Sequence, residues 1–134
     1  MLTITIDRSL EEPVYAQVAR QVRRLIASGT LSPETKLPSV RRLAGDLGVN
    51  LNTIARSYRL LEGEGFLVIR GRSGVTVAPP AGKVEGSTHA KLLEQLRTTL
   101  AQLRQVGVTG DELLGVLRRE VMDLDGRGAE NCDE

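Results

Sequence analysis

Two short helical patterns separated by a glycine constrain the fold of this chain more than any other feature. Ser39 is a good N-cap for a short helix, and Asn50 is a good N-cap for a second helix over residues 51–63. Gly48 lies between the two helices, where a tight turn needs a positive φ angle. Two short helices joined by such a turn predict a helix-turn-helix over about residues 39–62.

A pair of short strands directly after the second of these helices predicts a wing. Residues 66–70 and 75–78 have strand composition, and Gly71-Arg72-Ser73-Gly74 between them is typical of a hairpin turn. The expected fold class is therefore mainly α with a small β-wing. A winged helix-turn-helix domain is followed by a short two-helix dimerisation region.

The segments before the helix-turn-helix complete the first domain. Residues 2–6 alternate in polarity and predict a short strand, whereas residues 30–38 contain two prolines and predict a loop. A helix is expected to open at Glu12-Pro13 and to stop at Gly29. One apolar stripe marks its buried face, at Val14, Val18, Val22, Leu25 and Ile26.

Beyond a proline-containing linker at residues 79–82, the second half has the pattern of two amphipathic helices. Gly107 separates them, and Thr109 opens the second helix with a capping box that includes Glu112. Two helices of this size cannot bury their apolar faces alone, so we expect two copies to pack into a four-helix arrangement. The expected dimerisation residues are Leu92, Leu93, Leu96, Leu100, Leu103, Leu113, Leu114, Leu117 and Val121.

The chain thus divides into a winged domain at residues 1–79, a helical dimerisation region at 80–125 and a flexible tail at 126–134. The net charge of +1 hides an asymmetry between the halves. Residues 1–78 hold 11 Lys/Arg against 7 Asp/Glu (+4), and residues 79–134 hold 7 against 10 (−3). A locally basic domain attracts phosphate even when the whole protein is near neutral.

The third helix, over residues 51–63, has two different faces. Ile54, Tyr58 and Leu61 follow i, i+4, i+7 spacing and are expected to point inward. Asn52, Arg56 and Arg59 repeat that spacing on another face, flanked by Thr53. In the major groove Asn pairs with adenine and Arg with guanine, and Thr holds a phosphate or touches a thymine methyl. Arg70 and Arg72 in the wing suit the DNA backbone or the minor groove.

Several motifs in the same order resemble the GntR family of bacterial transcription regulators, over about residues 10–78. They are Pro13-Val-Tyr-x-Gln17-Val, Ile26-Ala-Ser-Gly29-x-Leu31, Lys36-Leu-Pro-Ser39-Val-Arg41-Arg-Leu43-Ala, Leu47-Gly-Val-Asn50-x-Asn52-Thr53-Ile and Leu61-Glu-x-Glu-Gly65-Phe. The Asn-x-Asn-Thr run and the short helical second half look like the YtrA-like subfamily. That resemblance implies DNA contacts by Arg41 after the Leu-Pro motif and by Gly71 in the wing. It also implies contacts at the start of the third helix, by Asn50, Asn52 and Thr53.

Some readings of these residues stay open. Many members of the family carry arginines where this chain has Leu51 and Ala55, so those contacts do not transfer, and Arg56 is a candidate to compensate. Arg56 and Arg59 are alternatively ordinary solvated charges, and Arg41 alternatively pairs with Asp46. Ser39 and Asn50 are helix caps as well as candidate DNA contacts. His89 and Cys132 are expected to be incidental, and a ligand-binding role for the leucines of the second half is the lesser alternative.

The sequence therefore predicts a homodimeric, sequence-specific transcription regulator, more a repressor than an activator, on an inverted-repeat operator of double-stranded DNA. The alternative is a winged-helix module whose third helix binds a protein partner. One histidine and one cysteine cannot assemble a metal centre, no catalytic constellation is present, and no cofactor is expected. The chain has no apolar run of membrane-spanning length, so a cytoplasmic location is expected. The operator sequence, the regulated genes and any effector are not readable from these residues.

Overall fold

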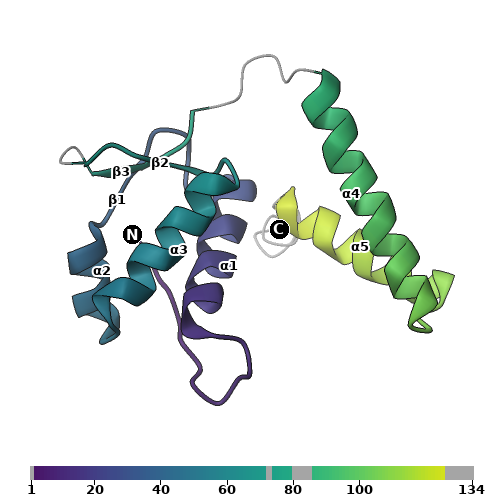
Figure 1. Ribbon diagram of the computed structural model, residues 1–134, viewed down its shortest axis with the longest axis horizontal. Helices are drawn as coiled ribbons and strands as arrows, with labels where there is room; N and C mark the ends of the chain where they lie inside the picture. Colours follow the sequence, from purple (N-terminus) through teal and green to yellow (C-terminus); the bar gives the residue numbers. More distant parts are fainter. Residues whose placement is uncertain (1, 72–73, 80–85, 126–134) are drawn as a thin grey trace, which may run out of the picture. The chain divides into compact units, whose positions relative to one another are not determined.

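The computed structural model describes residues 2–71, 74–79 and 86–125. Its elements follow in the order α1 (Val14–Ala27), β1 (Lys36–Leu37), α2 (Val40–Leu47), α3 (Leu51–Gly63), β2 (Leu67–Ile69), β3 (Val75–Val77), α4 (Gly86–Gln105) and α5 (Gly110–Leu124), as Figure 1 shows. The chain divides into two compact units, residues 1–80 and 81–134. None of the helices within the described ranges is long and apolar enough to cross a membrane.

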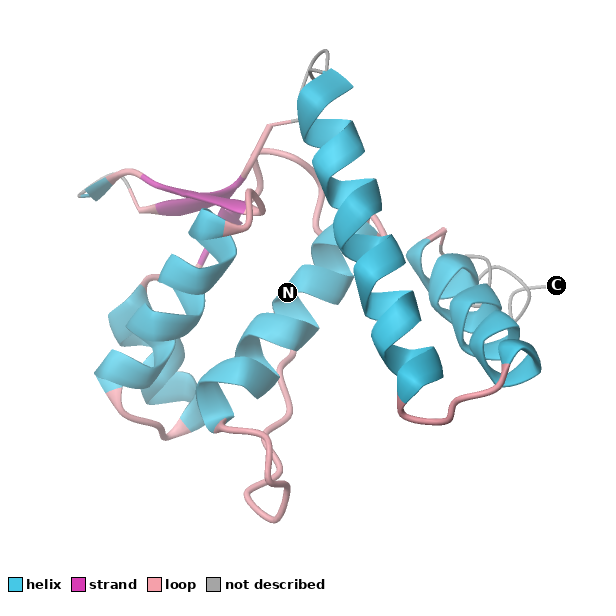
Figure 2. Cartoon of the chain, turned by 45° about the vertical axis from the view of Figure 1, so that its right-hand side comes forward, coloured by secondary structure: helices cyan, strands magenta, loops and turns pink. Residues whose placement is uncertain are grey.

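The first unit is a winged helix-turn-helix, as the sequence predicts. Helix α1 lies alongside α3, α2 packs against α3, and the three strands form a small antiparallel sheet in the order β1-β3-β2 (Figures 1 and 2). Strand β2 pairs with β3 so that Leu67 lies opposite Val77 and Ile69 opposite Val75. This hairpin is the wing.

One apolar core holds the three helices and the sheet together. The inward-facing residues expected on α3, Ile54, Tyr58 and Leu61, are all fully buried. The Tyr58 hydroxyl donates to the Pro38 carbonyl oxygen at 2.7 Å, so its polar end is satisfied inside the core. The other members of the core come from every element of the unit: Ile4, Val18, Ala19, Val22, Leu31, Leu37, Leu43, Ala44, Leu67, Val75 and Val77.

The caps expected at the helix-turn-helix are present. Ser39 Oγ accepts from the Arg42 amide at 3.1 Å at the start of α2. Asn50 Oδ1 accepts from the Asn52 amide at 2.8 Å at the start of α3. Gly48 ends α2 with φ +66° and ψ 37°, in the left-handed region that the turn was expected to need. These three residues fix where each helix begins and ends.

Two expectations about the strands of this unit are wrong. Residues 2–6 form no strand; instead the Gln21 amide exchanges hydrogen bonds with the Thr5 N–H (2.9 Å) and C=O (2.6 Å). The buried Gln17 amide does the same for the Asp7 N–H and C=O, at 2.9 Å each. Side-chain amides of α1 therefore make the backbone hydrogen bonds that a neighbouring strand would otherwise make. Conversely, the predicted loop 30–38 contains β1, whose two residues are too few to show an alternating pattern.

The second unit consists of α4 and α5, joined through residues 106–109 (Figure 2). Gly107 has φ +100°, and the Val108 amide donates to the Leu103 carbonyl at 3.0 Å, which closes α4. Thr109 is the expected N-cap of α5: its Oγ1 accepts from the Glu112 amide at 3.2 Å and donates to the Glu112 carboxylate at 3.1 Å. The expected linker beyond Pro79, the tail at 126–134 and Cys132 lie outside the described residues.

Candidate nucleic-acid interface

Helix α3 presents a polar face to solvent, directly opposite its core face. Asn52, Arg56 and Arg59 are exposed, and Thr53 is half-buried beside them. The same helix is anchored by fully buried Ile54, Tyr58 and Leu61, so its axis is held by the core rather than by surface contacts. A rigid helix with amide and guanidinium groups along one side has the shape and donor set that base edges and phosphates require.

The candidate arginines of α2 and α3 are left available by their surroundings. Arg41, Arg56 and Arg59 form no ion pair with another described residue, although other arginines of the unit do. Arg20 pairs with Glu12 at 3.1 Å and Arg23 pairs with Glu64 at 2.7 Å, both away from the outer face of α3. The carboxylate of Asp46 lies 4.0 Å from Arg42, not beside Arg41 as the alternative interpretation had it.

The other candidate residues are also at the surface where the structure describes them. Ser39 and Asn50 are exposed caps at the starts of α2 and α3. In the wing, Arg70 and Gly71 are exposed, and the Arg70 amide donates to the Gly74 carbonyl at 2.9 Å, which closes the hairpin. Arg72 lies outside the described residues.

The structure adds one residue that the sequence pattern did not single out. The guanidinium carbon of Arg56 lies over the ring of Tyr15 in α1, 3.8 Å from the ring centroid. The exposed Arg56 side chain thus has an aromatic partner, and no acidic partner among the described residues. The only sequence signal was the position of Tyr15 inside the Pro13-Val-Tyr motif, which does not say what the ring contacts.

The dimerisation candidates divide by burial. Leu92, Leu93, Leu96, Leu114 and Val121 are exposed, and Leu100, Leu103 and Leu117 are half-buried. Leu113 is buried already within the single chain. Within the described ranges, no group of three or more His, Cys, Asp and Glu residues is placed to hold a metal, and His89 is exposed.

Comparison with known proteins gives a family match over the winged unit. Residues 14–77 match the model of bacterial regulatory proteins of the gntR family. The chain is 33% identical over 126 residues to the HTH-type transcriptional repressor YtrA of Bacillus subtilis, with 92% of this chain and 95% of YtrA covered. It is 41% identical over 75 residues to the HTH-type transcriptional regulator Rv1152 of Mycobacterium tuberculosis, covering 56% of this chain but only 62% of Rv1152.

Solved structures with similar folds agree with this match. YtrA from Sulfolobus acidocaldarius, a GntR-family transcription factor, is 34% identical, with a TM-score of 0.59 over 90% of this chain and 97% of that chain. The DNA-binding domain of AraR in complex with operator ORX1 is 29% identical, with a TM-score of 0.51 over 57% of this chain and 96% of that chain. The second comparison covers little more than half of this chain.

Proposed function

Because the chain belongs to the GntR family of bacterial regulatory proteins, and its winged unit is the DNA-binding domain of that family, we propose that it is a homodimeric repressor of transcription. Each protomer inserts α3 into the major groove of one half of an inverted-repeat operator, and the wing at residues 70–74 lies on the neighbouring backbone or minor groove. The observation that carries this proposal is the exposed amide and guanidinium face of α3, set on a fully buried opposite face.

The residues of that face have complementary roles in this proposal. Asn52 and Arg56 reach base edges, where the two-point hydrogen bonds of Asn and Arg select adenine and guanine. Arg59, Thr53 and Arg41 hold the flanking backbone or a further guanine. The exposed helix starts at Ser39 and Asn50 offer backbone N–H groups and the positive end of a helix dipole toward phosphate. The relative YtrA is named a transcriptional repressor, and the AraR domain was solved in complex with an operator. Both findings support these proposed roles in DNA binding.

A second copy of the chain is the proposed partner of the helical unit. Large apolar side chains are exposed on both of its helices and in the connection between them. They are Leu92, Leu93, Leu96, Val106, Leu114, Val116, Val121, Met122 and Leu124. Leu113 is the buried hydrophobic residue of this unit within the described range. Exposed apolar surface of this extent on helices marks a protein interface.

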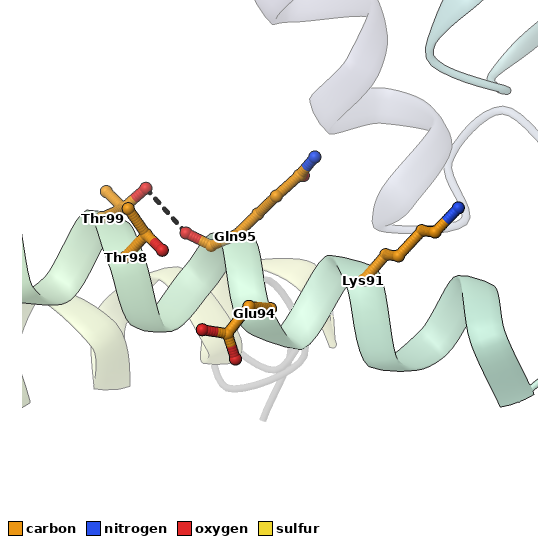
Figure 3. Close-up of a pocket in the computed structure, with 5 residues that line it drawn as sticks. All are labelled: Lys91, Glu94, Gln95, Thr98 and Thr99. Carbon is orange, nitrogen blue, oxygen red and sulfur yellow. Dashed lines mark hydrogen bonds between the residues drawn. The ribbon is translucent and has the colours of Figure 1, made fainter.

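The two faces of α4 differ in character, and this difference supports a choice of dimer interface. Lys91, Glu94, Gln95, Thr98 and Thr99 recur at helical spacing and form one polar face, drawn in Figure 3. Leu92, Leu93, Leu96, Leu100 and Leu103 fall on the opposite face. The leucine face, continued by the apolar residues of α5, is therefore the proposed dimer interface.

Selection and footprinting test the DNA-binding part of the proposal. The full chain is used to select duplexes from a random library, and footprints are mapped on its own upstream region. We expect an inverted repeat, an affinity near 10⁻⁸ M, and strong weakening between about 50 and about 300 mM salt. A reporter placed behind the selected site should lose expression when the chain is present. Equal affinity for random duplexes, or an affinity that does not change with salt, contradicts the proposal.

A matched pair of variants tests the dimer. Leu96→Glu places a carboxylate on the apolar face of α4, and Gln95→Glu places the same carboxylate on the polar face one residue away. Analytical ultracentrifugation should find Leu96→Glu shifted to monomer with weakened operator binding, and Gln95→Glu still dimeric. If both variants sediment like the parent chain, the leucine face of α4 is not the interface.

A further inference from the structure

Tyr15 lies at the edge of the proposed DNA-reading face without belonging to the helix-turn-helix. Tyr15 is half-buried on the first turn of α1, and its ring lies against Arg56 of α3. Together with Pro13, Val14, Asn52, Thr53 and Arg56 it lines a hollow of about 310 Å³. Three of those six residues are the ones proposed to meet DNA, so a group bound at Asn52 or Arg56 would also lie beside this ring.

The backbone of Tyr15 is fixed relative to α3. The Ser57 hydroxyl, fully buried, donates to the Tyr15 carbonyl oxygen at 2.7 Å and lies 3.1 Å from the Thr53 carbonyl oxygen. A buried hydrogen bond between two helices sets their register, because a shift of either helix would leave a polar group unsatisfied. The backbone of Tyr15 is therefore held beside Ser57, and its ring lies against Arg56, the residue before Ser57 in α3.

The contact between the two side chains restricts Arg56 without using its donors. At 3.8 Å from the ring centroid, the guanidinium interacts with the π-face of Tyr15. No described residue accepts a hydrogen bond from Arg56, so its five N–H donors remain for an incoming acceptor. A free arginine loses much rotamer entropy when it binds, whereas one already held on a ring loses less.

We propose that Tyr15 is a positioning residue for DNA recognition: its ring holds the Arg56 guanidinium in the orientation that α3 presents to the operator. This inference rests on the proposed function and extends it to a residue of α1. The hydroxyl of Tyr15 has no part in it, because the ring face makes the contact. Arg59, which has no such ring contact among the described residues, is the matched comparison on the same helix.

A double-mutant cycle on the full 134-residue chain tests the proposal. It compares a duplex of about 30 base pairs selected by the parent chain with a scrambled duplex of equal length. Tyr15→Leu should weaken binding to the selected duplex about tenfold and narrow the gap to the scrambled one. Tyr15→Phe, which keeps the ring, should bind like the parent chain. In the Arg56→Ala background Tyr15→Leu should have no further effect, whereas with Arg59→Ala the two effects should multiply.

Thermal unfolding of each variant separates positioning from folding. The proposal is overturned if folded Tyr15→Leu binds as the parent chain does, if Tyr15→Phe is as weak as Tyr15→Leu, or if Tyr15→Leu weakens binding equally with and without Arg56. If the parent chain selects no duplex at all, or Arg56→Ala binds unchanged, the proposed use of α3 fails and this inference fails with it. Selective binding with an unaffected Tyr15→Leu overturns the inference alone.

Discussion

Alanine at Gly45, inside α2, and at Gly48, the C-cap of α2, should change the free energy of unfolding in opposite directions. Gly48 has φ +66° and Gly45 lies within the helix, and a Cβ atom added at either position would have no neighbouring heavy atom within 4 Å. Steric clash is thus absent in both cases, and only the backbone conformation differs. Comparing the two alanine variants therefore measures the free-energy cost of placing a residue with a side chain in the left-handed conformation of the turn.

The magnitude follows from that difference. Gly48→Ala forces an L-residue into the left-handed region and should lower the free energy of unfolding by about 1–2 kcal/mol. Gly45→Ala removes a helical glycine and should raise it by about 0.5–1 kcal/mol. Because one kcal/mol shifts the melting temperature of a domain of this size by about 4–8 °C, the two variants, about 1.5–3 kcal/mol apart, should melt about 6–24 °C apart. Gly48→Asn should lie between Gly48→Ala and the parent chain, since Asn tolerates this region.

Tyrosine fluorescence during thermal and urea unfolding measures these changes in the winged unit specifically. Both tyrosines of the chain, Tyr15 and Tyr58, lie in that unit, and the chain has no tryptophan. If Gly48→Ala melts with the parent chain, the turn does not need a left-handed residue. If Gly45→Ala is destabilised instead, the space around that position is not open, and the reasoning from backbone conformation alone is refuted.

Two further predictions concern single side chains. Burial raises the pKa of the Tyr58 hydroxyl, so above about pH 10 the unfolded chain loses that proton before the folded chain does. The free energy of unfolding should therefore fall by about 1.4 kcal/mol per pH unit in this range. Tyr58→Phe should not show that decrease at alkaline pH, but its free energy of unfolding at pH 8 should be lower by about 1–3 kcal/mol, because the Pro38 carbonyl is left unpaired. Urea unfolding of the parent chain and of Tyr58→Phe from pH 8 to 11 measures both effects. The prediction is contradicted if the two proteins lose stability with pH at the same rate. Thr109→Ala should cost about 1 kcal/mol by removing the N-cap of α5, whereas Thr109→Asn should cost much less. Helix content by circular dichroism and the dimer dissociation constant measure this loss, and equal values for both variants would rule out the cap as its cause.

The elements with local signals could be predicted closely from the sequence. Helix α3 begins after Asn50 and ends at Gly63, as expected, because the cap and the terminal glycines act on their own neighbours in the chain. The match to the gntR family and to YtrA confirms the recognition that rested on the ordered motifs of residues 10–78.

The features that depend on distant residues could not be predicted. Residues 2–6 carry a strand pattern, but Gln17 and Gln21 satisfy that backbone from α1 instead of a neighbouring strand. Strand β1 exists because β3 passes beside it, and two residues cannot display that pairing in advance. The Tyr15–Arg56 contact likewise depends on the packing of α1 against α3. That the candidate residues touch DNA, and that the leucines of α4 and α5 pair two copies, remain predictions.

The charge distribution makes the predicted DNA contacts depend on the predicted pairing of two copies. The winged part carries +4 and the rest of the chain −3, so attraction to DNA is local and the whole protein gains little from its net charge of +1. One α3 face with two exposed arginines neutralises few phosphates, and the affinity of a single protomer at physiological salt should be modest. When two protomers are joined, binding of the second protomer to its half-site becomes intramolecular, at an effective concentration of about millimolar. The affinity for the operator then rises although no further residue contacts DNA. If the exposed leucines pair two protomers as proposed, they contribute to operator affinity as much as the arginines do. Leu96→Glu should then impair operator binding as severely as Arg56→Ala.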